Sequence, residues 1–251
     1  MLALFEYCLE KEDIQIIVKY WIRILNIKLG WIHEFDKLVV NYVMCFVNLF
    51  FIQITINIID YSTFDCGQLI CSGSNDNTVR VWNIEDNKQI RLFNGHSKNT
   101  FCVKFSLYYY RNYRCNVICS SSADKTIRFW DFKHNRQLQL FNGHTGSIYD
   151  IKFSPFNSGR YLCSGSLDKT IRLWDIETFK SLHIFNGHED GVCCVDISLL
   201  QSSNNNKNDN SIGVIGGNGY TICSGSYDKT IRIWDVETTR QLIAFKGHKN
   251  T

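Results

Sequence analysis

Proline is almost absent from this sequence of 251 residues, since Pro155 is the only one. Proline cannot donate its backbone nitrogen to a strand ladder, so its near absence leaves the predicted strands with a full set of donors. The eleven cysteines form no Cys-x-x-Cys pair, and no Gly-x-Ser-x-Gly sequence occurs. The first absence excludes the usual spacing of a zinc site, and the second excludes the nucleophile elbow of an α/β-hydrolase.

A strong excess of one charge is also lacking, because Lys and Arg number 27 against 24 Asp and Glu. The net charge of +3 is too small for a dedicated nucleic-acid binder, so we expect no nucleic-acid partner. Four cysteines recur once per repeat, between an apolar residue and a serine: Cys71, Cys119, Cys163 and Cys223. We expect buried free thiols in a reducing compartment, and no metal or cofactor.

A secretory signal is missing from the start of the chain. Acidic residues stand where such a signal needs positive charge, at Glu6, Glu10, Glu12 and Asp13. The uncharged run from Leu38 to Ile59 is long enough to span a membrane, but its four interior Asn and Gln residues favour a buried helix or strand. We therefore expect an intracellular, cytoplasmic protein, with the nucleus as an open alternative and no membrane association.

What the sequence does contain is one unit copied four times. IKFSPFNSGRYLCSGSLDKTIRLW (151–174) aligns without a gap with IDYSTFDCGQLICSGSNDNTVRVW (59–82). Two further copies end at Trp130 and Trp234, so that the four repeat tryptophans are separated by 48, 44 and 60 residues. The same separations recur between four Gly-His pairs, namely Gly95-His96, Gly143-His144, Gly187-His188 and Gly247-His248.

Each unit predicts four short strands. In the third copy the strand-forming runs are Ile148–Phe153, Tyr161–Ser164, Thr170–Trp174 and Ser181–Phe185. They are rich in β-branched and aromatic residues and are separated by Gly, Asn, Asp and Ser. The second and fourth copies are longer between the first and second strands, where the fourth contains the Asn-rich stretch Ser202 to Asn210. We expect this stretch to be disordered, and both insertions to emerge opposite the Gly-His loops.

The region before the repeats has a helical pattern. Apolar residues at helical spacing between Ile14 and Lys28 predict one helix, and Asp36 to Phe51 predicts a second. We expect the helices to pack on the repeats of the same chain. A helix that binds a partner is the alternative.

The repeat resembles the WD-repeat (WD-40) family of G-protein-beta-like repeats, in which a Gly-His pair is followed about thirty residues later by Trp-Asp. The Trp-Asp pairs are Trp130-Asp131, Trp174-Asp175 and Trp234-Asp235, whereas the first copy has Trp82-Asn83. The resemblance implies a mainly β fold of four four-stranded propeller blades, incomplete or open, after an α-helical N-terminal extension. The implied bounds are 1–50 for the extension, 51–248 for the WD region (repeats about 52–94, 95–142, 143–186 and 187–246) and 247–251 for the start of a fifth repeat.

Each complete repeat supplies His, Ser, Asp and Trp in fixed phase, and the resemblance implies that the four form a buried hydrogen-bonded chain. The members are His96, Ser120, Asp124, Trp130, His144, Ser164, Asp168, Trp174, His188, Ser224, Asp228 and Trp234. The first repeat has Ile52 in place of His beside Ser72, Asp76 and Trp82, so its blade should be the weakest. A catalytic triad is the alternative, but a nucleophile is needed once and must be exposed, whereas this combination occurs three times. We expect no enzyme activity.

The resemblance also implies a protein-binding face, whose contact residues lie three and five places after the repeat His and one place before the turn Asp. They are Asn99, Phe101, Ala123, Ser147, Tyr149, Leu167, Gly191, Cys193 and Tyr227, with Thr55, Asn57 and Asn75 in the first repeat. We expect a scaffold or adaptor that presents this face to proteins or peptides. The alternative for these residues is the lining of a central channel.

Some WD-repeat substrate receptors of ubiquitin ligases carry Trp-Asp-x-Arg, and the nearest match is Trp130-Asp131-Phe132-Lys133, with Lys in place of Arg. That function is the runner-up within the binding class. Open blade edges also predict self-association, or association with another repeat protein, because bare sheet ends recruit partners.

Overall fold

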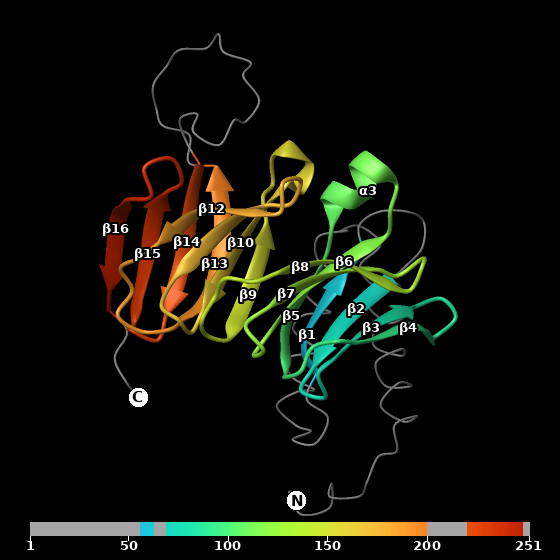
Figure 1. The fold of residues 1–251 in the computed structure, drawn as a ribbon. Coiled ribbons are helices and arrows are strands. Elements are labelled where there is room, and N and C mark those ends of the chain that lie inside the picture. Colours follow the sequence, from blue (N-terminus) through green and yellow to red (C-terminus); the bar gives the residue numbers. More distant parts are fainter. Residues whose placement is uncertain (1–55, 63–68, 200–219, 248–251) are drawn as a thin grey trace, which may run out of the picture. The chain divides into compact units, whose positions relative to one another are not determined.

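The computed structural model describes residues 56–62, 69–199 and 220–247. Within these ranges the chain forms four antiparallel sheets of four strands each, and every sheet is built from one repeat (Figure 1). The sheets are named blades one to four in chain order. Strands within a blade follow one another in sequence order, so each blade is a simple up-and-down meander.

The bounds of the strands repeat from blade to blade. Blade one contains β1 (Ile56–Tyr61), β2 (Leu69–Ser74), β3 (Thr78–Asn83) and β4 (Lys88–Asn94). Blade two contains β5 (Thr100–Phe105), β6 (Val117–Ser122), β7 (Ile127–Asp131) and β8 (Arg136–Phe141). Blade three contains β9 (Ile148–Phe153), β10 (Tyr161–Ser166), β11 (Ile171–Asp175) and β12 (Lys180–Phe185). Blade four contains β13 (Val192–Leu199), β14 (Tyr220–Ser226), β15 (Thr230–Asp235) and β16 (Gln241–Lys246).

The third blade shows how closely the strand pattern determines the structure. The predicted strand Ile148–Phe153 is β9 with the same bounds. The second predicted strand continues past Ser164, because Gly165 pairs with Ile171 and Ser166 with Ile148. The mainly β fold of four-stranded blades is thus confirmed.

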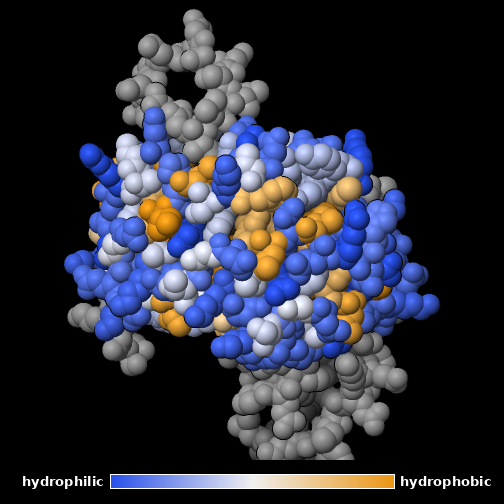
Figure 2. All heavy atoms as spheres, viewed as in Figure 1, coloured by the Kyte–Doolittle hydropathy of each residue, from blue (hydrophilic) through white to orange (hydrophobic). Residues whose placement is uncertain are grey.

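The apolar side chains are mostly inside. On the face drawn in Figure 2 hydrophilic residues predominate, and hydrophobic residues reach the surface in separate patches. The first strands β1, β5, β9 and β13 pack on one another in that order. The described blades therefore form a series, and β1 and β13 at its two ends are not joined in this way, as in an incomplete propeller.

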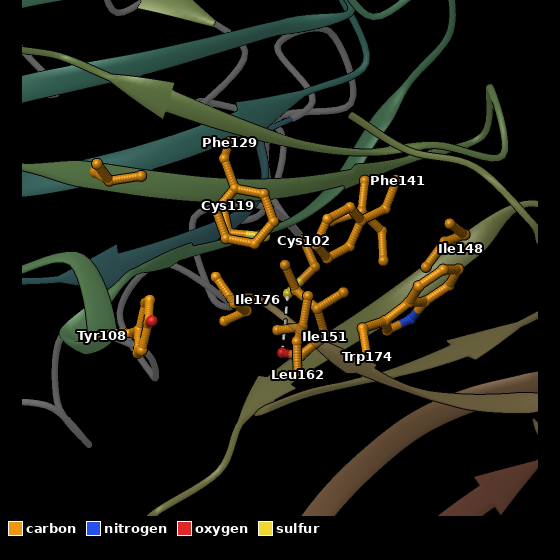
Figure 3. Close-up of a cluster of buried hydrophobic side chains, with 12 residues drawn as sticks. Cys102, Tyr108, Cys119, Phe129, Phe141, Ile148, Ile151, Leu162, Trp174 and Ile176 are labelled. Atoms are coloured by element: carbon orange, nitrogen blue, oxygen red, sulfur yellow. Dashed lines mark hydrogen bonds between the residues drawn. The ribbon is translucent and has the colours of Figure 1, made fainter. Parts of the chain in front are cut away.

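The cores lie between consecutive blades. The core between blades two and three combines Phe129 and Phe141 of the earlier blade with Ile151, Leu162 and Trp174 of the later one (Figure 3). Corresponding residues form the core between blades one and two and the core between blades three and four. Blades two and three therefore each contribute side chains to two cores.

One aromatic contact recurs at each of these three joints. The last phenylalanine of the outer strand lies against the repeat tryptophan of the next blade. The ring centroids are 5.1 Å apart for Phe93 and Trp130, and 5.4 Å apart for Phe141 and Trp174. For Phe185 and Trp234 the separation is 6.1 Å. The contact therefore marks the interface between two blades.

The insertion in blade two contains a helix, α3 (Leu107–Tyr113), which the sequence pattern does not predict. Tyr108 is buried in the core between blades two and three, and α3 contacts the 3₁₀ turn η1 (Asn157–Gly159) of blade three. Because α3 joins β5 to β6 while Asp124 lies in the turn from β6 to β7, the helix is at the expected end of the strands, away from the Asp turns. The insertion is thus an ordered part of a joint.

Several predicted segments lie outside the described residues. They are the N-terminal helices (14–28 and 36–51), the Asn-rich stretch 202–210 and His248 of the last Gly-His pair. In the described ranges no helix is long and apolar enough to cross a membrane.

Candidate binding face

The His-Ser-Asp-Trp residues of blade three form one hydrogen-bonded chain. The Trp174 indole N–H donates to the Ser164 hydroxyl over 2.8 Å. His144 lies between that hydroxyl and the Asp168 carboxylate, with both nitrogen–oxygen distances 2.8 Å. The Asp168 carboxylate can only accept, so His144 donates to it from Nδ1, and in a neutral imidazole Nε2 then accepts the Ser164 proton. A neutral imidazole satisfies every member.

Blades two and four repeat this chain. His96 lies 2.8 Å from both Asp124 and Ser120. In blade four His188 lies 2.7 Å from Asp228 and 2.8 Å from Ser224. The tryptophan–serine bonds, from Trp130 to Ser120 and from Trp234 to Ser224, are also 2.8 Å long.

Blade one keeps only part of the arrangement. Trp82 donates to Ser72 over 3.0 Å. Asp76 binds the guanidinium of Arg80 at 2.8 Å and accepts a bond from the backbone N–H of Thr78. Its carboxylate is exposed, whereas the corresponding carboxylates of the other blades are buried against a histidine. The end of blade one is therefore tied together by fewer buried bonds.

The electrostatics agree with a neutral histidine and an ionised aspartate. Burial lowers the pKa of His144 and of His188, and this effect outweighs the opposite effect of Asp168 and Asp228. Burial alone would raise the pKa of Asp168, but hydrogen bonds from His144 and Thr170 hold it well below its ordinary value. The hydrogen-bonded chain of His, Ser, Asp and Trp therefore keeps one fixed set of protons at neutral pH.

These buried hydrogen bonds are better suited to holding strands and loops in position than to catalysis. The hydroxyls of Ser120, Ser164 and Ser224 are buried and already bonded to both Trp and His. A nucleophile needs an open approach for its substrate, which these serines do not have. Within the described ranges no three His, Cys, Asp or Glu residues are grouped so that they could hold a metal ion.

In blades two, three and four, a backbone hydrogen bond beside the His-Ser-Asp-Trp residues holds the predicted contact residues in place. The residue before the turn Asp donates its N–H to the carbonyl of the residue three places after the His. The pairs are Ala123 with Asn99 at 2.9 Å, Leu167 with Ser147 at 2.8 Å, and Tyr227 with Gly191 at 2.9 Å. The structure thus brings six of the nine predicted contact residues into three equivalent pairs.

The aromatic members of the predicted face meet across three blades. Phe101 at the start of β5 lies 4.9 Å from Tyr149 of β9, measured between ring centroids. Tyr149 lies 6.0 Å from Tyr227, which stands in the turn between β14 and β15 of blade four, and the two rings meet edge to face. We name these three rings the aromatic row. Partial desolvation, together with Cys193 and Tyr149, raises the pKa of Tyr227 to about 12, so its hydroxyl is a neutral hydrogen-bonding group.

Gly191 lies next to Leu167 and Tyr227 and leaves room for both side chains. It is buried, and a Cβ atom there would lie 2.7 Å from Cδ1 of Leu167 and 3.3 Å from Cδ2 of Tyr227. Gly191 therefore exposes no side chain of its own and allows Leu167 and Tyr227 to approach. Asn99, Ala123, Ser147 and Cys193 are half-buried around the row.

In blade one, Asn57 stands at the repeat position that Phe101 and Tyr149 occupy in blades two and three. The Asn57 amide nitrogen donates to Oδ1 of Asn75 over 2.6 Å and to the carbonyl of Thr100 over 2.8 Å. Thr55 lies outside the described residues. The aromatic row therefore covers blades two to four only.

Ion pairs that no motif in the sequence predicted join neighbouring first strands. Lys104 Nζ lies 3.4 Å from the Asp60 carboxylate, which also accepts the backbone N–H of Phe105. Lys152 Nζ lies 3.2 Å from Asp196 between blades three and four. All four residues stand two places before the aligned serine, so opposite charges at one repeat position were an available signal.

Comparison with known proteins agrees with this geometry. The family model described as WD domain, G-beta repeat matches residues 59–83, 87–131, 135–175 and 179–235. A search of curated proteins gives no match. Each matched segment ends at the Trp-Asp or Trp-Asn pair of a third strand, and the last three segments begin just before the fourth strand of the preceding blade. The chain therefore belongs to the WD-repeat family.

Proposed function

We propose that this chain is a non-enzymatic scaffold that binds a protein or peptide on the aromatic row and Leu167. WD-repeat domains generally mediate binding to other proteins, which is the coarse function that family membership carries. The observation that supports this particular surface is the continuous contact of Phe101, Tyr149 and Tyr227 across three blades.

The row has the properties of an interaction site. Tyr227 and Leu167 are large and exposed, and their loops are fixed by backbone bonds and by the buried His-Asp pairs. Aromatic side chains contribute large contact areas at low entropic cost, and they dominate binding hot spots. A partner that places apolar or aromatic side chains on the row would therefore gain affinity without reordering the loops.

The test compares direct binding of the intact chain and the triple variant Phe101→Ala, Tyr149→Ala, Tyr227→Ala. Peptides selected on the intact chain from a displayed library are measured by titration calorimetry. Tyr113→Ala is the matched control, because Tyr113 is 56% exposed against 54% for Tyr227 but lies on α3 at the other end of the strands. We expect the triple variant to lose binding and the control to keep it. Equal loss in both, or in neither, would contradict the proposal.

The ubiquitin-ligase alternative has less support. In Trp130-Asp131-Phe132-Lys133 the Asp131 carboxylate accepts the backbone N–H of Lys133 and lies 2.6 Å from His134 Nδ1. Phe132 is buried against Phe105. These contacts account for Asp131 and Phe132 within the fold itself. The scaffold function on the aromatic row is therefore the stronger candidate.

A further inference from the structure

One arginine of blade three lacks the partners that its counterparts have. Arg80, Arg128 and Arg232 stand two places before the repeat tryptophan, and each donates from Nη1 to a glutamine of the outer strand, over 3.2, 2.7 and 2.7 Å. Each also donates from Nε to the threonine two places earlier, over 3.1 to 3.4 Å, and forms an ion pair with the turn aspartate. Within the described residues Arg172 makes none of these bonds, and its Nε is buried without a hydrogen-bond partner.

A single difference in the outer strand accounts for the lost glutamine bond. In blade three Ser181 pairs with Trp174 across the strands, at the position that a glutamine occupies in each of the other blades. The glutamines are Gln89, Gln137 and Gln241. A serine hydroxyl is attached directly to Cβ and does not extend as far as a glutamine amide. Blade three therefore supplies no side-chain oxygen from β12 to its arginine.

The head of Arg172 is positioned by packing. Its Cζ lies over the Trp174 ring, 5.8 Å from the centroid, and Nη1 is 2.9 Å from the place of a Cβ atom on Gly143. Gly143 lies between β8 and β9, so the guanidinium is at the joint of blades two and three. The residue is half-buried, and only Nε is both buried and unpartnered, so the terminal Nη atoms reach the surface. An acceptor from outside can therefore approach them.

Apolar side chains stand at the same joint. Ile184 is the cross-strand neighbour of Arg172 and is 41% exposed. Phe179, just before β12, is 46% exposed, and its ring centroid lies 6.3 Å from that of Phe141. Phe141 in turn stacks on Trp174, the ring that carries the guanidinium (Figure 3). The exposed part of this joint thus combines a cation with apolar surface.

Two features distinguish β12 from the outer strands of blades one and two. Phe179 has a left-handed backbone with φ 59°, where blades one and two have asparagines, which adopt this conformation more readily. Leu182 is 40% exposed, whereas the aligned Ile90 and Leu138 pack on a core. Among the described strands β12 pairs with β11 alone, so one side of its backbone has no ladder. An extended peptide can add to such an edge.

We propose that Arg172 and β12 bind an extended segment of a partner protein, with an acidic side chain of that segment on the guanidinium. A carboxylate oxygen would take the place that the glutamine oxygen occupies in the other blades, and apolar residues of the segment would cover Ile184 and Phe179. Bonds from a guanidinium to a carboxylate are stronger than bonds between neutral groups. The exposed Lys180 at the start of β12 also favours an acidic segment.

The surroundings favour a peptide over a nucleic acid. A nucleic acid is held by several cations along its backbone. At this joint the exposed neighbours of the guanidinium are apolar, as in the core of a protein interface. The site is separate from the aromatic row, which lies at the Asp turns, so the two can be tested independently.

The probe is a displayed library of random seven-residue peptides, selected on the triple alanine variant of the aromatic row, so that binding to the row does not contribute. We expect the selected peptides to share an acidic residue flanked by apolar ones. Their affinity for the native chain, measured by fluorescence anisotropy, should be the same as for the triple variant. A selection that enriches no peptide, or peptides without an acidic residue, would overturn the proposal.

The sharpest variant is Ser181→Gln, which gives Arg172 the internal acceptor found in the other blades. It should bind the selected peptides about tenfold more weakly, the effect of losing one charged hydrogen bond. It should also raise the melting temperature, because the guanidinium gains a partner. Arg172→Gln should lose binding as well. The matched control is Arg128→Gln, at the same position of blade two, which should bind normally.

Circular dichroism of each variant checks that its strands are retained. Equal binding by the native chain and folded Ser181→Gln would refute the site, as would equal loss in Arg172→Gln and Arg128→Gln. Single-stranded oligothymidylate is the competing probe. If it bound the native chain and lost affinity for Ser181→Gln, the ligand would be a phosphate polymer and the peptide proposal would be wrong.

Discussion

The imidazole of His144 lies 2.8 Å from the Ser164 hydroxyl, although the two residues are twenty positions apart in the chain. The bond joins the loop before β9 to the middle of β10, and Trp174 of β11 reaches the same hydroxyl. Three elements of one blade are therefore held by a single buried oxygen.

Replacing His144 with Ala should destabilise the fold by about 1–3 kcal/mol, because Ser164 and Asp168 lose a buried partner. Urea denaturation of the native and variant chains gives the difference in unfolding free energy. His183→Ala serves as the control, since His183 is half-buried on β12 and belongs to no such chain. Equal stability of His144→Ala and the native protein would contradict a structural role.

The stability of blade one should depend less on Ser72 than the stability of blade three depends on Ser164. The Ser164 hydroxyl serves both Trp174 and His144, whereas Ser72 accepts a bond from Trp82 with no histidine in the described part of its blade. We expect Ser164→Ala to cost about 1 kcal/mol more than Ser72→Ala, which is the contribution of roughly one hydrogen bond. Unfolding free energies of the two variants test this. A larger loss for Ser72→Ala would show that blade one is not the weakest.

Stability should fall on mild acidification. The pKa of His144 and of His188 is lowered from 6.5 in the folded state, so these imidazoles stay neutral in conditions where the unfolded chain takes up protons. Because the unfolded state then binds more protons, the unfolding free energy rises with pH and decreases as the pH falls from about 7 to about 5. The lowered pKa values of Asp124, Asp168 and Asp228 add a further loss at lower pH.

The urea midpoint, followed across this pH range, measures the effect. The double variant His144→Ala, His188→Ala should show a shallower dependence than the native chain. An unchanged slope would mean that these two histidines are not the groups responsible.

Gly191→Ala should disturb the binding face. The new methyl group would lie 2.7 Å from Leu167 Cδ1 and 3.2 Å from Leu167 Cα, so backbone as well as side chain must move. Such overpacking costs about 1–3 kcal/mol. We expect a lower melting temperature and weaker binding of peptides selected on the aromatic row. Ser181→Ala is the control for stability, because Ser181 is exposed on β12. Equal melting temperatures for both variants would refute the role of Gly191.

The sequence predicted the strands well because strand formation depends on local alternation and on turn residues that recur in every copy. It did not predict α3, because Leu107 to Tyr113 contains four tyrosines and no helical spacing of apolar and polar residues. Tyr108 instead gains its stability from the core between two blades, which no local pattern reveals. The burial of Gly191 was missed for the same reason, since it depends on how Leu167 and Tyr227 fold over it.

The shared cores also bear on how such a chain can change in length. Each core takes one half from a blade and the other half from the next, and the contact of Phe141 with Trp174 has counterparts on both sides. A duplicated repeat inserted in register would therefore find both of its interfaces already matched. Gene duplication could lengthen the series by whole blades without new core residues, while loss of part of a repeat would break two interfaces at once.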